Sequence, residues 1–312
     1  MLGTDDSLAI MKLLQVPGVG PAKVNALLDW CGESGRSVSS ILREPELLRT
    51  RFTAEQVATI DAEESCLEKE LAEDDVKLLG ANDATYPKLL RAGMKRKAPP
   101  LLYYRGNIEL LSKPAIGFCG SRKASEKGIS TAIDCAELLA EQDIVVASGY
   151  AAGVDITTHI SALRVGGSTI VVLPEGILHF RIKGEIKSYW DWERVLVISQ
   201  FESKLPWSVR NAMARNSVIC GLSKAMILIE AGTTGGSIAA GHTCLEMGRP
   251  LFAPVYEGMP ETAAGNRLLL EQGAHPLLRN RRTKRASIDK VLRAVELPGP
   301  DLSSEEQMSL FA

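Results

Sequence analysis

The sequence predicts an α/β fold in which a Rossmann-like, mostly parallel sheet follows a small helical N-terminal domain. From residue 115 onward, short β-branched runs alternate with helical stretches, which is typical of βαβ units and a parallel sheet. The first 74 residues carry helical periodicity instead. A chain of 312 residues is longer than most single domains, so there is room for both parts.

The composition is that of a folded globular protein, with 45% apolar and 24% charged residues. Six cysteines are scattered without a C-x-x-C pair, and the start MLGTDDSLAI does not resemble a signal peptide. Apolar runs are too short to span a membrane. We therefore expect a cytoplasmic protein without membrane attachment.

The net charge of −2 argues against a protein covered in positive charge but allows local basic clusters. One cluster is the run Lys95, Arg96 and Lys97. The denser one comprises Arg279, Arg281, Arg282, Lys284 and Arg285. Each either binds a polyanion or is a solvated charged surface.

Residues 1–74 are predicted to form the helical domain. Two helices within residues 4–30 flank the turn VPGVGP at residues 16–21, which looks like a helix-hairpin-helix element. Such an element would present glycine amides and the helix start at Ala22 and Lys23 to a DNA phosphate. A plain helical hairpin that only packs on the body is the alternative. Further on, Thr53 and Gln56 give a partial capping-box signature.

Residues 75–278 are predicted to form the Rossmann-like domain. Residues 76–79 suggest a short strand, and residues 98–107 an extended piece that ends in a turn. The further predicted strands are 115–119, 144–147, 169–173, 195–199, 225–230 and 251–254. The predicted helices lie near 126–140, 155–165, 207–220 and 237–247.

The remaining residues are predicted to be accessory. The basic run begins a helical extension at residues 279–296. Residues 297–312 have the composition of a disordered linker that ends in apolar residues, so they either contain a docking peptide or have no partner.

Ligands of an open parallel sheet bind beyond the carboxyl ends of the strands, so the loops after the strands are candidate sites. Three such loops are rich in glycine and serine, and each opens or approaches a helix whose amides suit an anion. None matches G-x-G-x-x-G or the P-loop, so no nucleotide cofactor or metal is expected. The candidate phosphate-binding residues are Gly120, Ser121, Arg122, Ser148, Gly149, Gly153, Arg215, Asn216, Gly235, Gly236 and Ser237.

Three titratable residues near these loops allow more than one interpretation. Asp155 and His159 are four residues apart and are either an acid/base couple or a helix cap with a locally bonded histidine. Glu230 is either a base or an acceptor that orders the adjacent glycine amides.

At this point the sequence resembles the DNA-processing protein A family (DprA, also called Smf), over most of residues 75–274. The resemblance rests on many short motifs in a common order. They are YPKLL at 86–90, LYYRG at 102–106, GSR at 120–122, SG at 148–149, AGVD at 152–155 with His159, GG at 166–167, RN at 215–216, GLS at 221–223, EA at 230–231, GS at 236–237, GR at 248–249, GN at 265–266 and GA at 273–274.

This resemblance implies an extended Rossmann fold and a non-enzymatic protein that binds single-stranded DNA. It also implies a homodimer that helps to load a RecA-type recombinase during DNA uptake (competence and transformation) or recombination. By motif, the DNA contacts would be Ser121, Arg122, Gly149, Gly153 and Arg215.

The sequence departs from the family pattern in two places. Ser217 stands where the family commonly has a second arginine after the Arg-Asn pair, which puts the expected basic pocket in doubt. Trp190 and Trp192 lie in a stretch that looks inserted, and they either stack on bases or form a packed cover.

The tail resembles the short peptides that dock on the bacterial sliding clamp, with Gln307 first and Leu310 and Phe311 as apolar anchors. A different class of function is a phosphoribohydrolase-like enzyme that hydrolyses nucleoside monophosphates with Glu230 and the loop at 232–236. A nucleotide-responsive defence or signalling protein is a third interpretation.

Overall fold

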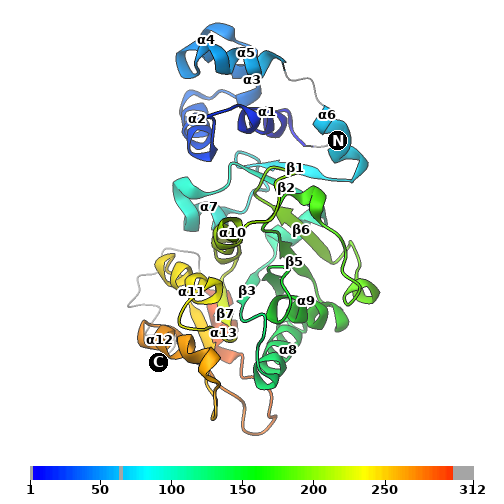
Figure 1. Cartoon of the computed structure of the whole chain (residues 1–312), viewed down its shortest axis with the longest axis vertical. Coiled ribbons are helices and arrows are strands. Elements are labelled where there is room, and N and C mark those ends of the chain that lie inside the picture. The colour runs from blue at the N-terminus through cyan, green and yellow to red at the C-terminus, as the bar shows by residue number, and fades with distance from the viewer. Residues whose placement is uncertain (1–2, 63–65, 298–312) are drawn as a thin grey trace.

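The computed structural model describes residues 3–62 and 66–297. The N-terminal helices stack on one end of a sheet that runs the length of the remaining chain (Figure 1). These helices are α1 (Asp5–Gln15), α2 (Pro21–Ser34), α3 (Val38–Leu42), α4 (Pro45–Arg51), α5 (Ala54–Ala62) and α6 (Cys66–Glu73).

The capping box predicted at Thr53 is confirmed. The Gln56 amide donates to Thr53 Oγ1, and the Thr53 amide donates to Gln56 Oε1, which satisfies two free amides at the start of α5. Gln56 also donates to the Pro17 carbonyl and accepts from Lys23 Nζ at 2.9 Å. The turn between α1 and α2 is thus bonded to α5, as expected for a hairpin that packs on its neighbours.

In the described part of the chain the sheet has nine strands, in the order β1-β2-β6-β5-β4-β3-β7-β8-β9. The pairs β1/β2 and β2/β6 are antiparallel, and all other neighbours are parallel, so the predicted mostly parallel α/β fold is confirmed. The strands are β1 (Lys77–Gly80), β2 (Leu101–Gly106), β3 (Ala115–Cys119), β4 (Val145–Ser148), β5 (Thr169–Val172), β6 (Val195–Ser199), β7 (Ala225–Leu228), β8 (Leu251–Pro254) and β9 (His275–Leu277).

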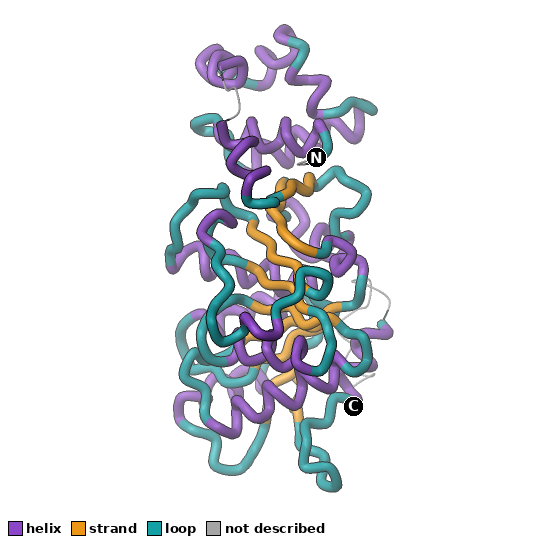
Figure 2. The backbone as a smooth tube through the Cα atoms, turned by 90° about the vertical axis from the view of Figure 1, so that its right-hand side faces the viewer, coloured by secondary structure: helices purple, strands orange, loops and turns teal. Residues whose placement is uncertain are grey.

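Helices cover both faces of the sheet, which Figure 2 shows in a view turned by 90°. In Figure 1, α8 and α9 lie on one side and α10 and α11 on the other. Their bounds are α7 (Lys88–Met94), α8 (Glu126–Ala140), α9 (Val154–Arg164), α10 (Val209–Leu222), α11 (Gly236–Glu246), α12 (Ala264–Glu271) and α13 (Asp289–Glu296). Short 3-10 helices are η1 (Lys95–Lys97), η2 (Ile108–Ser112), η3 (Ile177–His179), η4 (Lys187–Tyr189) and η5 (Glu261–Ala263).

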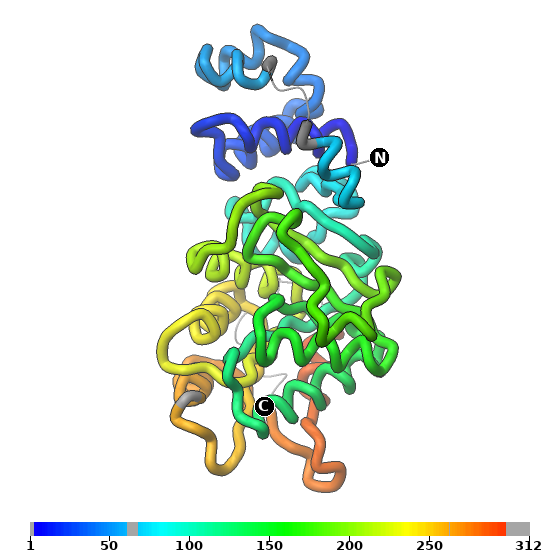
Figure 3. The backbone as a smooth tube through the Cα atoms, turned by 45° about the vertical axis from the view of Figure 1, so that its right-hand side comes forward, coloured from blue at the N-terminus to red at the C-terminus, as the bar shows by residue number. Residues whose placement is uncertain are grey.

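One hydrophobic core joins the N-terminal helices to the sheet. Ile10 and Leu13 of α1 are fully buried in the same cluster as Leu78, Leu79 and Leu102 of β1 and β2. The helices therefore sit directly on the antiparallel end of the sheet (Figure 3). Burial of this kind is the main favourable term in folding, so the two parts stabilise each other.

The basic run at 279–285 is not helical, in contrast to the helical extension expected from residue 279. It forms a turn closed by a bridge between Arg279 and Ala286, and the helix begins only at Asp289. Arg285 forms ion pairs with Asp134 and Glu137 of α8. Acidic residues of α8 thus neutralise part of the positive charge of this run.

None of the described helices is both long and apolar enough to cross a membrane. The docking peptide expected at Gln307, Leu310 and Phe311 lies outside the described residues.

Candidate nucleic-acid interface

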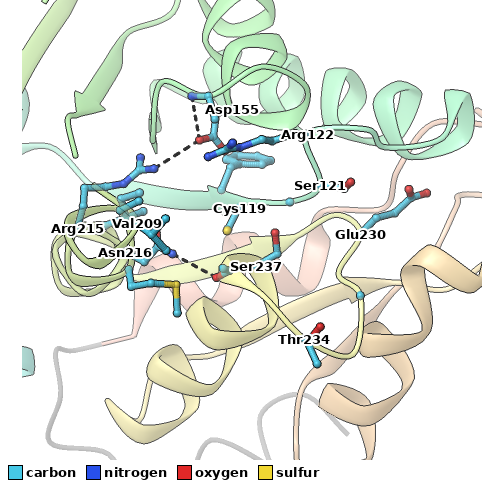
Figure 4. Close-up of a pocket in the computed structure, with 18 of the residues that line it drawn as sticks. Cys119, Ser121, Arg122, Asp155, Val209, Arg215, Asn216, Glu230, Thr234 and Ser237 are labelled. Atoms are coloured by element: carbon cyan, nitrogen blue, oxygen red, sulfur yellow. Dashed lines mark hydrogen bonds and ion pairs between the residues drawn. The ribbon is translucent and has the colours of Figure 1, made fainter. Parts of the chain in front are cut away.

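The candidate site lies where the strand order reverses. From β3 the chain proceeds to β4, β5 and β6 on one side, whereas β7, β8 and β9 lie on the other. The loops that leave the carboxyl ends of β3 and β7 therefore diverge and leave a crevice, which is the usual ligand position in such sheets. A cavity of about 380 Å³ occupies this place (Figure 4).

Most of the predicted residues meet at this cavity. Its lining includes Gly120, Ser121, Arg122, Arg215, Asn216, Gly236 and Ser237. Ser148, Gly149, Gly153 and Gly235 do not line the cavity, although they are close in sequence to residues that do. The rule that loops gather at one edge of a parallel sheet thus identifies the place, but the individual glycines have different functions.

The loop after β4 is packed rather than open. A Cβ atom on Gly149 would lie 1.6 Å from Nη1 of Arg215, and one on Gly153, at φ +81°, would lie 2.6 Å from the Ser121 carbonyl oxygen. The Ser148 hydroxyl is buried and donates to the Phe118 carbonyl at 2.9 Å. These three residues pack against neighbouring groups, whereas Ala151 and Asp155 of the same segment line the cavity.

Arg215 places a buried guanidinium at the cavity. It is 6% exposed, and its Nη1 donates to the Val172 carbonyl at 3.0 Å. Its Nη2 lies 3.8 Å from Oδ2 of Asp155. Its Nε is buried and has no hydrogen-bond partner among the described residues. Buried charges need compensation, and here the protein supplies one carboxylate and one carbonyl.

Asp155 and His159 belong to the scaffold of this loop. Burial raises the pKa of Asp155, although Arg215 and the Ala151 amide oppose the shift. Burial lowers the pKa of His159 to about 4, so the imidazole is neutral at neutral pH. Its Nε2 donates to the Gly149 carbonyl, and its Nδ1 lies 2.5 Å from Oγ1 of Thr169. The ring therefore fixes the loop instead of sharing a proton with Asp155.

The loop after β7 is open. Gly235 is the N-cap of α11 at φ +100°, and no described atom lies within 4 Å of the position of a Cβ there. A Cβ on Gly236 would meet only Sδ of Met213, at 3.7 Å. The start of α11 therefore has free space around both glycines, and Gly236 and Ser237 line the cavity. Free amides and the positive end of the helix dipole suit an anion.

Glu230 orders a different segment from the one expected. Its fully buried carboxylate accepts from the Ser125 amide at 2.8 Å, from the Ser125 hydroxyl at 2.5 Å and from the Tyr256 hydroxyl. The expected partners, the adjacent glycine amides, are not among these donors. Glu230 thus ties the start of α8 to the segment after β8.

Three exposed apolar residues at the cavity were missed by sequence reasoning. Trp207 is 48%, Val209 67% and Met213 39% exposed, and all three line the cavity. A sequence signal did exist, because Val209 and Met213 are four residues apart on the helix that also carries Arg215. Exposed apolar surface of this kind suits a stacked base.

The tryptophans at 190 and 192 form a packed cover. The Phe180 and Trp190 rings lie 5.5 Å apart, and the Trp190 and Trp192 rings 5.2 Å. Tyr150 packs against Phe180 and accepts at its carbonyl from Lys183 Nζ. These rings cover the loop after β4 and are engaged with one another.

The fold and the cavity define a class: a Rossmann-like α/β protein with a crevice at its topological switch point, where such proteins usually bind their ligands. The sequence profile of the family described as DNA recombination-mediator protein A matches residues 77–286, and the chain belongs to this family. The resemblance inferred from the motifs is thereby confirmed.

Curated relatives and solved structures agree with this assignment. The chain is 31% identical over 179 residues to DNA processing protein DprA of Streptococcus pneumoniae, covering 57% of this chain and 63% of that protein. It is 32% identical over 200 residues to Protein Smf of Escherichia coli, covering 63% of this chain and 53% of that protein. The chain thus spans between about half and two-thirds of these relatives.

The fold matches two solved structures. One is DNA processing protein A from Streptococcus pneumoniae, with a TM-score of 0.72, 24% identity and coverage of 89% of this chain and 95% of that chain. The other is DNA processing protein A from Helicobacter pylori, described for its single-stranded DNA binding mode, with a TM-score of 0.57, 24% identity and coverage of 71% and 94%.

Proposed function

We propose that this protein binds single-stranded DNA in the crevice at the switch point and acts, without catalysis, as a recombination mediator. The observation that carries the proposal is the open start of α11 opposite Arg122, with Ser121 and Ser237 beside it. These groups match the needs of a phosphodiester. Membership of the recombination-mediator family and the single-stranded DNA binding mode described for the Helicobacter pylori relative support it.

The geometry allows a phosphate and a base to be held together. A phosphate at the α11 amides would accept hydrogen bonds and face the exposed Arg122 guanidinium. A base would rest against Trp207, Val209 and Met213, whose contacts do not depend on base identity. Such a site binds many sequences and discriminates against a duplex, whose bases are already stacked.

The finer parts of the proposal rest on the family resemblance. We propose a cytoplasmic homodimer that delivers the strand to a RecA-type recombinase during DNA uptake or recombination. The peptide at Gln307, Leu310 and Phe311 would bind the sliding clamp.

A nucleoside-monophosphate hydrolase is less compatible with the site. A general base needs a free lone pair that faces the substrate. Glu230 lines the cavity, but three donors already occupy its carboxylate, because Oε1 accepts from the Ser125 and Tyr256 hydroxyls and Oε2 from the Ser125 amide, which leaves one of about four lone-pair positions. This carboxylate is therefore engaged in holding the start of α8.

Fluorescence anisotropy with labelled single- and double-stranded oligonucleotides over a salt series tests the proposal. We expect salt-steep binding that favours single strands, and a loss of about 10-fold in Arg122→Gln because a charged hydrogen bond is lost. Arg281→Gln, an exposed change in the turn after β9 that does not line the cavity, is the matched control. Absence of single-strand binding, together with nucleotide hydrolysis that disappears in Glu230→Gln, would overturn the proposal.

A further inference from the structure

A second, larger groove lies beside the cavity. It is lined by the basic run at residues 95–97, which does not line the cavity. It has a volume of about 880 Å³ and is formed by the end of α7, by η1 and by one face of α10 and α11. Lys95, Arg96 and Lys97 line it on one wall and Ser217 on the other. The single carboxylate in its lining is that of Glu246.

The basic run is free to meet a ligand. Lys95, Arg96 and Lys97 are exposed, and none of them has an ion-pair partner among the described residues. In the other basic cluster Arg279 and Arg285 pair with acids of α8, whereas Arg281, Arg282 and Lys284 are exposed and have no ion pair among the described residues. Three unpaired cations along one groove create a positive field that attracts a polyanion.

The backbone of this run is held firmly although its side chains are exposed. Asn25 of α2 donates to the carbonyls of Arg96 and Ala98, at 3.0 and 2.8 Å. Arg249 holds the preceding helix by donating to the Leu89 carbonyl at 3.1 Å. The backbone of Lys95 has φ +52° and ψ −128°, a conformation that residues other than glycine rarely adopt. Strained conformations persist where the surroundings impose them, and they cluster at functional sites.

The groove continues from the cavity along two helices. On α10, Met213 lines the cavity, and Ser217, one turn later and about 6 Å further along the helix axis, lines the groove. On α11, Gly236 lines the cavity and Thr243 the groove, and residues seven apart share a helix face. A strand that leaves the cavity along this face therefore reaches the basic run without crossing a layer of the fold.

We propose that this groove is a second contact for single-stranded DNA, in which Lys95, Arg96 and Lys97 bind the phosphates of the strand that emerges from the cavity. This inference rests on the proposed function and extends its footprint. The positive charge of the groove comes from the segment between α7 and β2. The residue that α10 contributes to the groove is Ser217, which is uncharged. The N-terminal helices take part through Asn25, which fixes the run.

The test compares two triple variants by anisotropy over a salt series with a labelled oligothymidine. Lys95→Gln, Arg96→Gln and Lys97→Gln are combined in one protein. The control combines Arg281→Gln, Arg282→Gln and Lys284→Gln, which remove the same charge from the exposed turn after β9 and line neither the cavity nor the groove. If each lost cation meets one phosphate, the slope of log affinity against log salt becomes shallower by about 2. Affinity at low salt then falls at least about 10-fold, and the control keeps the wild-type slope.

Two further substitutions sharpen the test, one in the wild type and one in the groove triple variant. Glu246→Gln removes the carboxylate of the groove and is expected to raise affinity, whereas Ser217→Arg in the groove triple variant is expected to restore part of the lost affinity and slope. Circular dichroism melts check that each variant is folded.

The outcomes separate the two proposals. A wild-type protein that fails to bind single strands overturns the proposed function. A wild-type protein that binds, with a groove triple variant of unchanged affinity and slope, overturns the groove alone. Equal losses in both triple variants also overturn it, because they indicate a general charge effect.

Discussion

The glycine-rich loops before α9 and α11 are similar in sequence but differ in how closely their glycines are packed. Both lead into a helix through a glycine of positive φ, Gly153 before α9 and Gly235 before α11. At Gly153 the missing side chain makes room for the carbonyls of Ser121 and Arg122, whereas Gly235 faces open space. The glycines of the first loop are part of the packing, whereas those of the second have free space around them. Glycine content alone therefore does not identify a phosphate site.

The largest expected effect tests this difference directly. Gly153→Ala combines an unfavourable φ with a methyl group 2.6 Å from a carbonyl oxygen, so we expect it to cost about 3 kcal/mol or more of unfolding free energy. Gly235→Ala has the same kind of φ but free space, so it should cost only about 1 kcal/mol. Urea unfolding of both variants measures the two values. Equal losses would contradict the division into a packed and an open loop.

The packed loop should also confer a pH dependence through His159. In the folded protein burial lowers the pKa of His159 to about 4, below the usual value of 6.5, so the unfolded chain binds the proton more readily. Stability should therefore fall as pH drops from about 6.5 to about 4, by about 3 kcal/mol from this group.

Urea unfolding of the wild type and of His159→Gln at several pH values isolates this contribution. The variant is less stable at pH 7 because it loses the ring contacts, but it lacks the histidine part of the acid sensitivity. Identical pH profiles in this window would show that His159 does not carry the effect.

Lys95 is the reverse case of Gly153 and Gly235, because a residue with a side chain adopts a positive φ there. Lys95→Gly should stabilise the protein by about 1 kcal/mol because the strain at φ +52° is relieved. The same change removes a groove cation and should weaken single-strand binding. Unfolding measurements on this variant check the expected gain in stability, and anisotropy measurements check the expected loss of affinity. A loss of stability would mean that the lysine side chain makes a packing contact of its own.

The smallest effect on stability is expected at Gly236. A methyl group there meets only Met213 at an ordinary distance, so unfolding free energy should change by no more than about 0.5 kcal/mol. Access to the α11 amides becomes narrower, so single-strand affinity should fall. Gly236→Ala measured beside Gly153→Ala thus separates binding from folding. Unchanged affinity would remove this helix start from the site.

Local sequence patterns predict those elements whose boundaries have local causes. Strands 115–119 and 195–199 and helix 126–140 occur with the predicted bounds, the helix because Ser125 caps it. The strand β9 was not predicted, because it has three residues, one of them proline, and depends on pairing with β8. The helix expected from residue 279 starts ten residues later, since acids on α8 hold Arg285 in a turn.

The candidate site follows the same division. The topology of a parallel sheet brings Gly120, Arg122, Gly236 and Ser237 together, and this could be predicted. Whether Gly149 faces a ligand or the Arg215 guanidinium depends on a helix 60 residues away in the chain, and no local pattern records it. The exposure of Trp207 was equally inaccessible, since an apolar residue before a helix is buried in most contexts.

The N-terminal helices and the sheet share one core, and this limits how the protein can change over evolutionary time. A gene without the first 74 codons would leave Leu78, Leu79 and Leu102 without their cover. It would also leave the basic run without Asn25. The helices cannot be exchanged for another module without matched changes in β1 and β2. The N-terminal helices thus depend on residues of β1 and β2 that lie within the matched family region, although the family profile begins only at residue 77.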